Sequence, residues 1–498
     1  MRTVRTLLAL LLSLPLFPSS DARAGDVAVA VEDAIRLAVE NNLDLQVQTF
    51  SPAITEAGIR GARGIYDTRL TALLDHREND AQVAPGSATA DRQRFFDFDA
   101  GVQRLVPTGG TASVSVNNAW FADSQGTSFS RYANPQLSFS FTQPVLQGWG
   151  REVTERGITL AQDSADVSLA DWRQKAESTA SAASSRFYDL YKARENLETR
   201  RASLAVARRI HQENEARVKA GVLASFQLLD SELGVLSRET DLLASERARR
   251  EAADGLGVFL QRKEPGEIVP VVGPVAERID TTEEAAIAVA LRKRPELVRA
   301  RIGVHSGEFS EKVSRNLALP SLSLAGTVGV TGLGKSYGEG FEDMASGKYP
   351  NWSVALNFSF PMGNSSALAE LDANRLKAGQ ARVALRSVEE SVALEVRTAL
   401  RALETRYRQI EVARKGVAVA GVRFESYEKR QKLGLATTKD LLDAESQLVA
   451  AKEGLVGALA DYQVAVTEFY RSTGELLDRH NMGVDGKSIA SKARKGTR

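Results

Sequence analysis

The chain has no cysteine, and only four histidines occur among its 498 residues. Without cysteine there is no disulfide framework, no thiolate metal site, no cysteine nucleophile and no lipid-anchored cysteine. The histidines are scattered, without the spacing of metal ligands, at His76, His211, His305 and His480. We therefore expect neither a metal site nor a cofactor.

An excess of charge of one sign is also lacking. The 64 basic and 63 acidic residues leave a formal net charge of +1, whereas a nucleic-acid-binding domain usually carries a basic excess. Serines, acids and histidines are present, but no nucleophile elbow or paired catalytic motif surrounds them. We expect no nucleic-acid partner and no enzymatic activity.

Long hydrophobic runs are missing as well. The apolar run at residues 7–17 is broken by Pro15 and follows two arginines, which is the pattern of a secretory signal peptide. We predict a signal peptide over residues 1–24, because the alternative, an N-terminal membrane anchor, needs a longer span. No later stretch is long enough for a membrane-spanning helix, so a mature protein that enters a membrane must do so as a β-barrel.

The most informative feature that is present is an internal repeat. Ala34 in the first half corresponds to Ala286 in the second, and at the same offset Leu45 corresponds to Leu297. In each half a helical segment passes into alternating residues, and a long helical region follows. The sequence therefore predicts two copies of one structural plan.

The long helical regions lie at residues 151–258 and 365–472. Both are rich in good helix formers and almost free of proline, and their apolar positions recur every three or four residues. Each is interrupted once by a glycine after a basic stretch, a usual helix stop. We interpret each region as a helical hairpin, with the tips at Gly221, Val222, Gly434 and Leu435. Such hairpins need neighbouring hairpins or subunits to bury their apolar stripes.

Between the helices, residues 66–144 and 320–361 contain segments with a period of two. In one of them Trp352, Val354 and Leu356 alternate with small polar residues. An apolar face opposite a small polar face is typical of a transmembrane barrel strand, although a half-buried strand of a soluble sandwich alternates in the same way.

The export signal and two long polar loops, at residues 123–134 and 331–349, favour the barrel. The first half also has an extra alternating pair at residues 95–120, with no equivalent in the second half. Whether this pair joins the barrel wall or lies elsewhere is left open by the sequence, and so is the number of strands in the barrel.

These patterns predict an order of segments along the chain. The segments are a signal peptide (1–24), a first repeat (25–258: helix, strands 66–144, helical hairpin 151–258), a linker (259–280), a second repeat (281–474: helix, strands 320–361, helical hairpin 365–472) and a disordered basic tail (475–498).

Residues 329–336 match the phosphate-loop pattern G-x-x-x-x-G-K-S. A phosphate loop must open a helix whose N-terminus holds the phosphates. Glycines and further polar residues follow here, and we expect no helix to begin at this point. We interpret the segment as a strand end and an external loop.

Taken together, the sequence resembles the TolC-like outer-membrane efflux family over residues 31–474. The resemblance is carried by a set of short segments in a fixed order: Glu32-Asp33-Ala34-Ile35-Arg36-Leu37-Ala38, Leu319-Pro320-Ser321-Leu322, Gly434-Leu435, Leu442-Asp443-Ala444 and Tyr470-Arg471-Ser472-Thr473-Gly474. Each segment alone is weakly specific, whereas the set in this order is specific.

The resemblance implies an α+β membrane protein. It would be a homotrimer in which a transmembrane β-barrel in outer-membrane lipid continues into a long periplasmic α-helical barrel. It would serve as the passive outer-membrane exit duct of a tripartite efflux or type I secretion system in a Gram-negative bacterium. A periplasmic adaptor would dock at the hairpin tips, and an inner-membrane transporter of the RND, ABC or MFS type would supply the energy. The substrate is not indicated.

The family closes its duct at the tips, where acidic residues surround the aperture, and Asp440 and Asp443 match that acidic pair by position. Six carboxylates from three subunits would attract cations. The alternative is that these aspartates only begin a helix, where acidic side chains suit the dipole. The best-known members also use a tyrosine and an arginine in the gate, and this chain has Gln431 and Ala436 there, so either its closing bonds differ or its gate is looser.

An exported structural coiled coil, such as an adhesin stalk, is the rival interpretation. It accounts for the long helices but not for alternating strands in both halves.

Overall fold

The computed structural model describes residues 27–80, 82, 92–123, 131–262, 268–271 and 273–483. The predicted signal peptide at 1–24 and most of the predicted tail lie outside these residues. The chain divides into two compact units, which are described separately. Unit 1 comprises Met1–Asn42, Ala182–Arg278 and Thr405–Val464, and unit 2 comprises Leu43–Ser181, Ile279–Glu404 and Ala465–Arg498.

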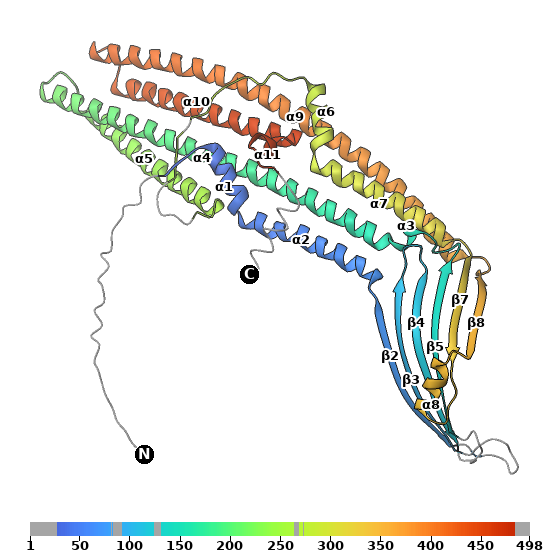
Figure 1. The fold of residues 1–498 in the computed structure, drawn as a ribbon. Helices are drawn as coiled ribbons and strands as arrows, with labels where there is room; N and C mark the ends of the chain where they lie inside the picture. Colours follow the sequence, from blue (N-terminus) through green and yellow to red (C-terminus); the bar gives the residue numbers. More distant parts are fainter. Residues whose placement is uncertain are drawn as a thin grey trace, which may run out of the picture. The chain divides into compact units, whose positions relative to one another are not determined.

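A six-stranded antiparallel sheet forms one end of unit 2 (Figure 1). Its strands, in their order across the sheet, are β2 (Arg69–Asp80), β3 (Arg92–Leu105), β4 (Thr111–Asp123), β5 (Arg131–Pro144), β7 (Ser321–Thr331) and β8 (Tyr349–Ser359). The pair at residues 95–120 belongs to β3 and β4 and lies inside this sheet, between β2 and β5. The pair is therefore part of the same sheet as the other strands.

Helices make up the rest of unit 2. They are α2 (Leu43–Arg63), the 3-10 helix η1 (Gly64–Tyr66), α3 (Arg151–Thr154), the first part of α4 (Arg156–Lys219), α6 (Glu283–Lys293), α7 (Pro295–Leu317), α8 (Tyr337–Ala345), the first part of α9 (Ser365–Lys432), the end of α10 (Thr438–Thr473) and α11 (Leu476–Arg479). A core packs α6 and α7 against α9 and α10, through Ala286, Ala290, Leu297, Val392, Val396, Ala399 and Phe469. The spacing of three and four residues that predicts the helices places these side chains on one face.

Unit 1 contains the distal parts of the long helices. It holds α1 (Val31–Asn41), the rest of α4, α5 (Phe226–Phe259), and the later part of α9 with most of α10. Within the region predicted as a linker, β6 (Ile268–Pro270) pairs in parallel with β1 (Val27–Val29). The linker prediction was therefore too simple, because part of this segment has a strand partner.

The tail prediction also needs a correction at its start. Residues directly after Gly474 form α11, and its Leu476 and Leu477 are fully buried. A pair of adjacent leucines gains enough from burial to order this turn of helix. Residues 484–498 lie outside the described part of the chain.

The expectation for the segment after residue 336 was wrong. Helix α8 (Tyr337–Ala345) begins there, with Ser336 as its N-cap. The loop amides that would cradle a phosphate bond to the helix itself, since Leu333 N–H donates to Asp343 Oδ2 at 3.0 Å and Lys335 N–H donates to Glu339 Oε2 at 2.9 Å. These two carboxylates take up the loop amides and would repel a phosphate. The segment is therefore still not a phosphate loop.

None of the helices within the described residues contains a stretch sufficiently long and apolar to cross a membrane.

Candidate gate at the hairpin tips

Both tips have the same backbone turn, and glycine makes it possible. Gly221 and Gly434 have φ values of +69° and +74°, which only glycine adopts without strain. In the first tip Val222 N–H donates to Arg217 O at 2.9 Å, and in the second Leu435 N–H donates to Arg430 O at 2.8 Å. This six-residue closure of the helix end is the Schellman motif. Each glycine therefore lies in the turn between two consecutive long helices.

The residue after each glycine is apolar and exposed. Val222 is 77% exposed and Leu435 is 73% exposed, and Phe226 and Leu433 beside them are exposed as well. Exposed apolar side chains at the end of a hairpin bury no surface within their own chain, and such side chains are typical of a docking surface.

Asp440 has a local role at the start of α10. Its Oδ2 accepts hydrogen bonds from Thr437 Oγ1 at 2.7 Å and Thr437 N–H at 2.9 Å, while Asp440 N–H donates to Thr437 Oγ1 at 3.1 Å. These reciprocal bonds form a capping box. The hydrogen bonds from the hydroxyl and then from the backbone lower the pKa of Asp440. Asp443, three residues on, is exposed on the same side of the helix.

Two contacts join the hairpins close to the tips. Asn214 Nδ2 on α4 donates to Thr438 Oγ1 at 2.8 Å, and both side chains are buried. Arg217 Nη1 donates to the carbonyl oxygen of Gln431 at 3.4 Å. The side chain of Gln431 is buried. Its backbone carbonyl is the acceptor in this contact between the two hairpins.

A buried ion pair joins α5 to α10. Arg238 on α5 donates through Nη2 to Glu445 Oε2 at 2.9 Å, to Leu442 O at 2.9 Å and to Ser446 Oγ at 2.7 Å. The side chains of Arg238 and Glu445 are 11% and 4% exposed. Next to them Leu442 fills the space over Gly234, where an added Cβ would lie 2.7 Å from Leu442 Cδ1.

A separate charged cluster lies in unit 2, where α6 meets α7. Arg294 is 4% exposed. It donates to both carboxylate oxygens of Glu296 at 2.9 Å, and to Glu395 at 2.7 Å. Its Nη1 also donates to the carbonyl oxygens of Arg471 and Ser472, at 3.3 and 3.2 Å. One guanidinium thus connects the α6–α7 junction to α9 and to the end of α10.

Glu177 is buried close to this cluster. Burial raises the pKa of Glu177 to about 7, against the opposing charges of Arg173 and Arg294. Because this pKa lies above that of an unfolded glutamate, the folded chain binds the proton more tightly. The resulting stability is present below about pH 4.5 and is lost as pH rises through about 7.

We therefore expect the Glu177→Gln variant, which cannot ionise, to gain stability relative to the wild type as pH rises. The gain should amount to about 3 kcal/mol between pH 4.5 and pH 7.5. Chemical unfolding followed by the helical circular dichroism signal at several pH values measures it. A constant difference between the two proteins over this range would contradict the prediction, and Asp443→Asn serves as an exposed control.

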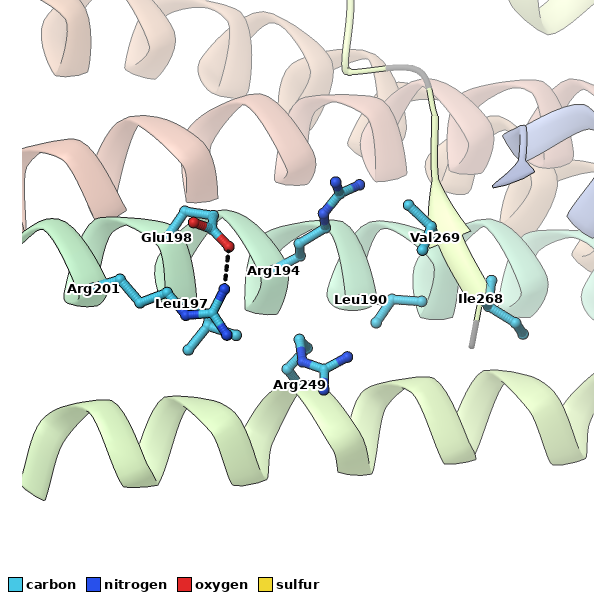
Figure 2. Close-up of a pocket in the computed structure, with 8 residues that line it drawn as sticks. All are labelled: Leu190, Arg194, Leu197, Glu198, Arg201, Arg249, Ile268 and Val269. Carbon is cyan, nitrogen blue, oxygen red and sulfur yellow. Dashed lines mark hydrogen bonds and ion pairs between the residues drawn. The ribbon is translucent and has the colours of Figure 1, made fainter. Parts of the chain in front are cut away.

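A cavity within unit 1 has a volume of about 260 Å³. As Figure 2 shows, Arg194 and Arg201 on α4 and Arg249 on α5 line it, and the dashed line joins Arg201 to Glu198. Arg194 also donates to Pro270 O at 2.9 Å. These bonds give the arginines structural partners around the cavity.

Sequence patterns do not single out Arg238, Glu445 or Arg294. Each is one of many charged residues on an amphipathic helix, and its partner is distant in sequence. The only local signal is that Arg294 precedes Pro295, a position that favours extended backbone and here separates α6 from α7.

Comparison with solved structures identifies the fold. The CmeC outer membrane channel of Campylobacter jejuni has the same fold, with a TM-score of 0.65 at 15% sequence identity, over 93% of this chain and 89% of that one. The fold is that of the outer-membrane channels.

Sequence comparison finds similar proteins. Residues 286–475 match the family model of the outer membrane efflux proteins. The outer membrane efflux protein BepC of Brucella suis is 23% identical over 325 residues, 65% of this chain and 69% of that protein. The outer membrane protein TolC of Vibrio cholerae is 25% identical over 322 residues, 61% of this chain and 70% of that protein. Over these regions the chain is similar to the TolC-like outer membrane efflux proteins.

Proposed function

We propose that this chain is the outer-membrane exit duct of a tripartite efflux or type I secretion system. Three copies would form one barrel in the outer membrane and one helical tunnel in the periplasm. A periplasmic adaptor and an inner-membrane transporter would complete the pathway, and the duct itself would carry out no chemistry.

The single observation that carries this proposal is the two-faced sheet. One row of partners across all six strands is apolar: Leu70, Val102, Val114, Phe139, Val328 and Trp352. The adjacent row, on the other face, is small or polar: Thr71, Gly101, Ser115, Ser138, Gly329 and Asn351. An exposed apolar face suits lipid and a polar face suits an aqueous lumen. A coiled-coil stalk has no need for such a sheet.

The exposed apolar tips support the docking of an adaptor there. Val222 and Leu435 follow the turn glycines and are held outward by the Schellman turns. The partner for such a surface is an apolar helix end or loop that buries these side chains.

The acidic pair at the second tip supports a cation-attracting aperture. Asp440 and Asp443 are both exposed, and three copies would bring six carboxylates together. We expect the variant Asp440→Asn/Asp443→Asn to lose most of its cation selectivity in planar lipid bilayers, because uncharged amides do not concentrate cations. Asparagine is chosen over alanine because it can still accept the capping hydrogen bonds from Thr437.

The matched control is Asp230→Asn, since Asp230 stands in the first hairpin where Asp443 stands in the second. Selectivity that falls equally in the control and the double variant would argue against an aperture formed by Asp440 and Asp443. The absence of any conductance from folded protein, even in a variant with loosened tips, would count against the duct itself.

A further inference from the structure

The β3–β4 hairpin is the part of the sheet without a counterpart in the second half of the chain. Its two strands have 14 and 13 residues, long enough to cross a bilayer, for which a tilted strand needs about 9–11 residues. It is placed between β2 and β5, with strand pairing on both sides. Removing it would leave β2 without its strand partner and β5 with only one of its two partners.

The turn of this hairpin is fixed to the rest of unit 2. Gly150 N–H and Gln143 Nε2 both donate to Thr108 O, at 3.1 and 3.0 Å. Gly109 has a φ of +90°, and a Cβ on it would lie 2.5 Å from Gly148 O. The turn therefore lies against the connection from β5 to α3, and the hairpin is an integral part of the sheet.

The hairpin has the same two faces as the other strands. Phe98, Val102 and Val114 are exposed on the face that carries Val328 and Trp352 on β7 and β8. On the opposite face Ser115 Oγ bonds to Ser138 Oγ at 2.9 Å, and Asn117 Nδ2 donates to Asp99 Oδ1 at 2.9 Å. The apolar face gives way to charge further along, where Arg94 pairs with Glu78 and Arg92 with Asp80.

We infer that β3 and β4 are membrane-wall strands, so that each copy contributes six strands and a trimer closes as an eighteen-stranded barrel. This inference rests on the proposed function, which places the sheet in lipid. The edge strands are β2 and β8, and in lipid their edges must be paired. A second copy of this chain pairs these edges, with β2 of one copy hydrogen-bonded to β8 of the next.

The strand number sets the width of the duct. With about 4.8 Å between strands and a tilt of about 40°, eighteen strands form a backbone cylinder roughly 35 Å across. Barrels of this strand number leave an open aqueous channel. The wall would then pass large hydrated solutes, and selection by size would lie at the tips.

Single cysteines test the inference, because the wild-type chain has none. Val114→Cys and Ser115→Cys are neighbours on β4 that point to opposite faces. In reconstituted trimers, labelling by a charged, water-soluble maleimide should be at least about tenfold slower at Val114→Cys than at Ser115→Cys, because the thiolate is the reactive form and apolar surroundings suppress it. A lipid-soluble maleimide should label Val114→Cys.

The same comparison on β8, with Val354→Cys and Ser353→Cys, distinguishes a failure of this inference from a failure of the proposed function. If Val354→Cys is protected and Val114→Cys is labelled as fast as Ser115→Cys, the hairpin lies outside the wall and the inference is overturned. If Val354→Cys is labelled fast too, the sheet is not in lipid and the proposed function fails with it. Electron cryomicroscopy of the trimer should count eighteen wall strands, and twelve would also overturn the inference.

Discussion

Replacing Arg238 with methionine is expected to destabilise the packing of the two hairpins by about 3–5 kcal/mol, because it leaves Glu445 buried without its counter-charge. Methionine keeps much of the volume of the side chain but none of the three hydrogen bonds to Glu445, Leu442 and Ser446. The two hairpins should separate near the tips. We expect a lower midpoint in chemical unfolding of the helical signal, and a larger single-channel conductance in planar bilayers.

Two controls make this prediction specific. The double variant Arg238→Met/Glu445→Leu removes both charges and should recover most of the stability, since apolar replacements of a buried pair are often neutral. Arg209→Met breaks a more exposed pair between α4 and α9, in which Arg209 Nη2 lies 3.3 Å from Glu428 Oε1, and should cost about 0–1 kcal/mol. Equal losses for Arg209→Met and Arg238→Met would refute the special role of the buried pair.

The second large effect is expected at Arg294. Arg294→Ala should cost about 3–5 kcal/mol, because Glu296, Glu395 and two carbonyl oxygens lose a buried donor together. The end of α10 should detach from the α6–α7 junction. Limited proteolysis should then cleave near residue 474 faster than in the wild type, and the unfolding midpoint should fall.

Two variants provide the comparison, Arg294→Lys and Lys293→Ala. Arg294→Lys keeps the charge but cannot reproduce the two-pronged contact with Glu296, so it should recover only part of the loss. Lys293→Ala removes a half-exposed lysine that bonds to Asp478 at 3.0 Å, and should cost no more than about 1 kcal/mol. If Arg294→Ala behaves like Lys293→Ala, the guanidinium does not hold these elements together.

The failed expectation at α8 shows where local patterns stop being sufficient. Two glycines, Gly338 and Gly340, lower the helix propensity of this nine-residue segment. The tertiary structure favours glycine at position 340, because a Cβ there would lie 2.9 Å from Pro135 Cδ on β5. Close packing against β5 and the Ser336 cap therefore outweigh propensity.

In the candidate gate, too, some features follow from local sequence and others depend on distant groups. The glycines at 221 and 434 are recognisable in the sequence because their positive φ is a property of a single residue. The capping box of Asp440 involves only Thr437, three residues away, and the alternative interpretation of Asp440 as a helix start describes this contact. Whether Asp440 and Asp443 also surround an aperture depends on other copies of the chain, and this remains a prediction.

The sequence by itself determined the features that repeat over a few residues: the helical spacing of the hairpins, the alternation of the strands and the glycine turns at the tips. These follow from backbone geometry, which acts between near neighbours. Only the tertiary structure decided that β3 and β4 lie inside the sheet, and that Arg238 meets Glu445, 207 residues away. Such contacts are selected by the burial and pairing of groups from distant segments, and an amphipathic pattern specifies the buried face of a helix but not the partner that covers it.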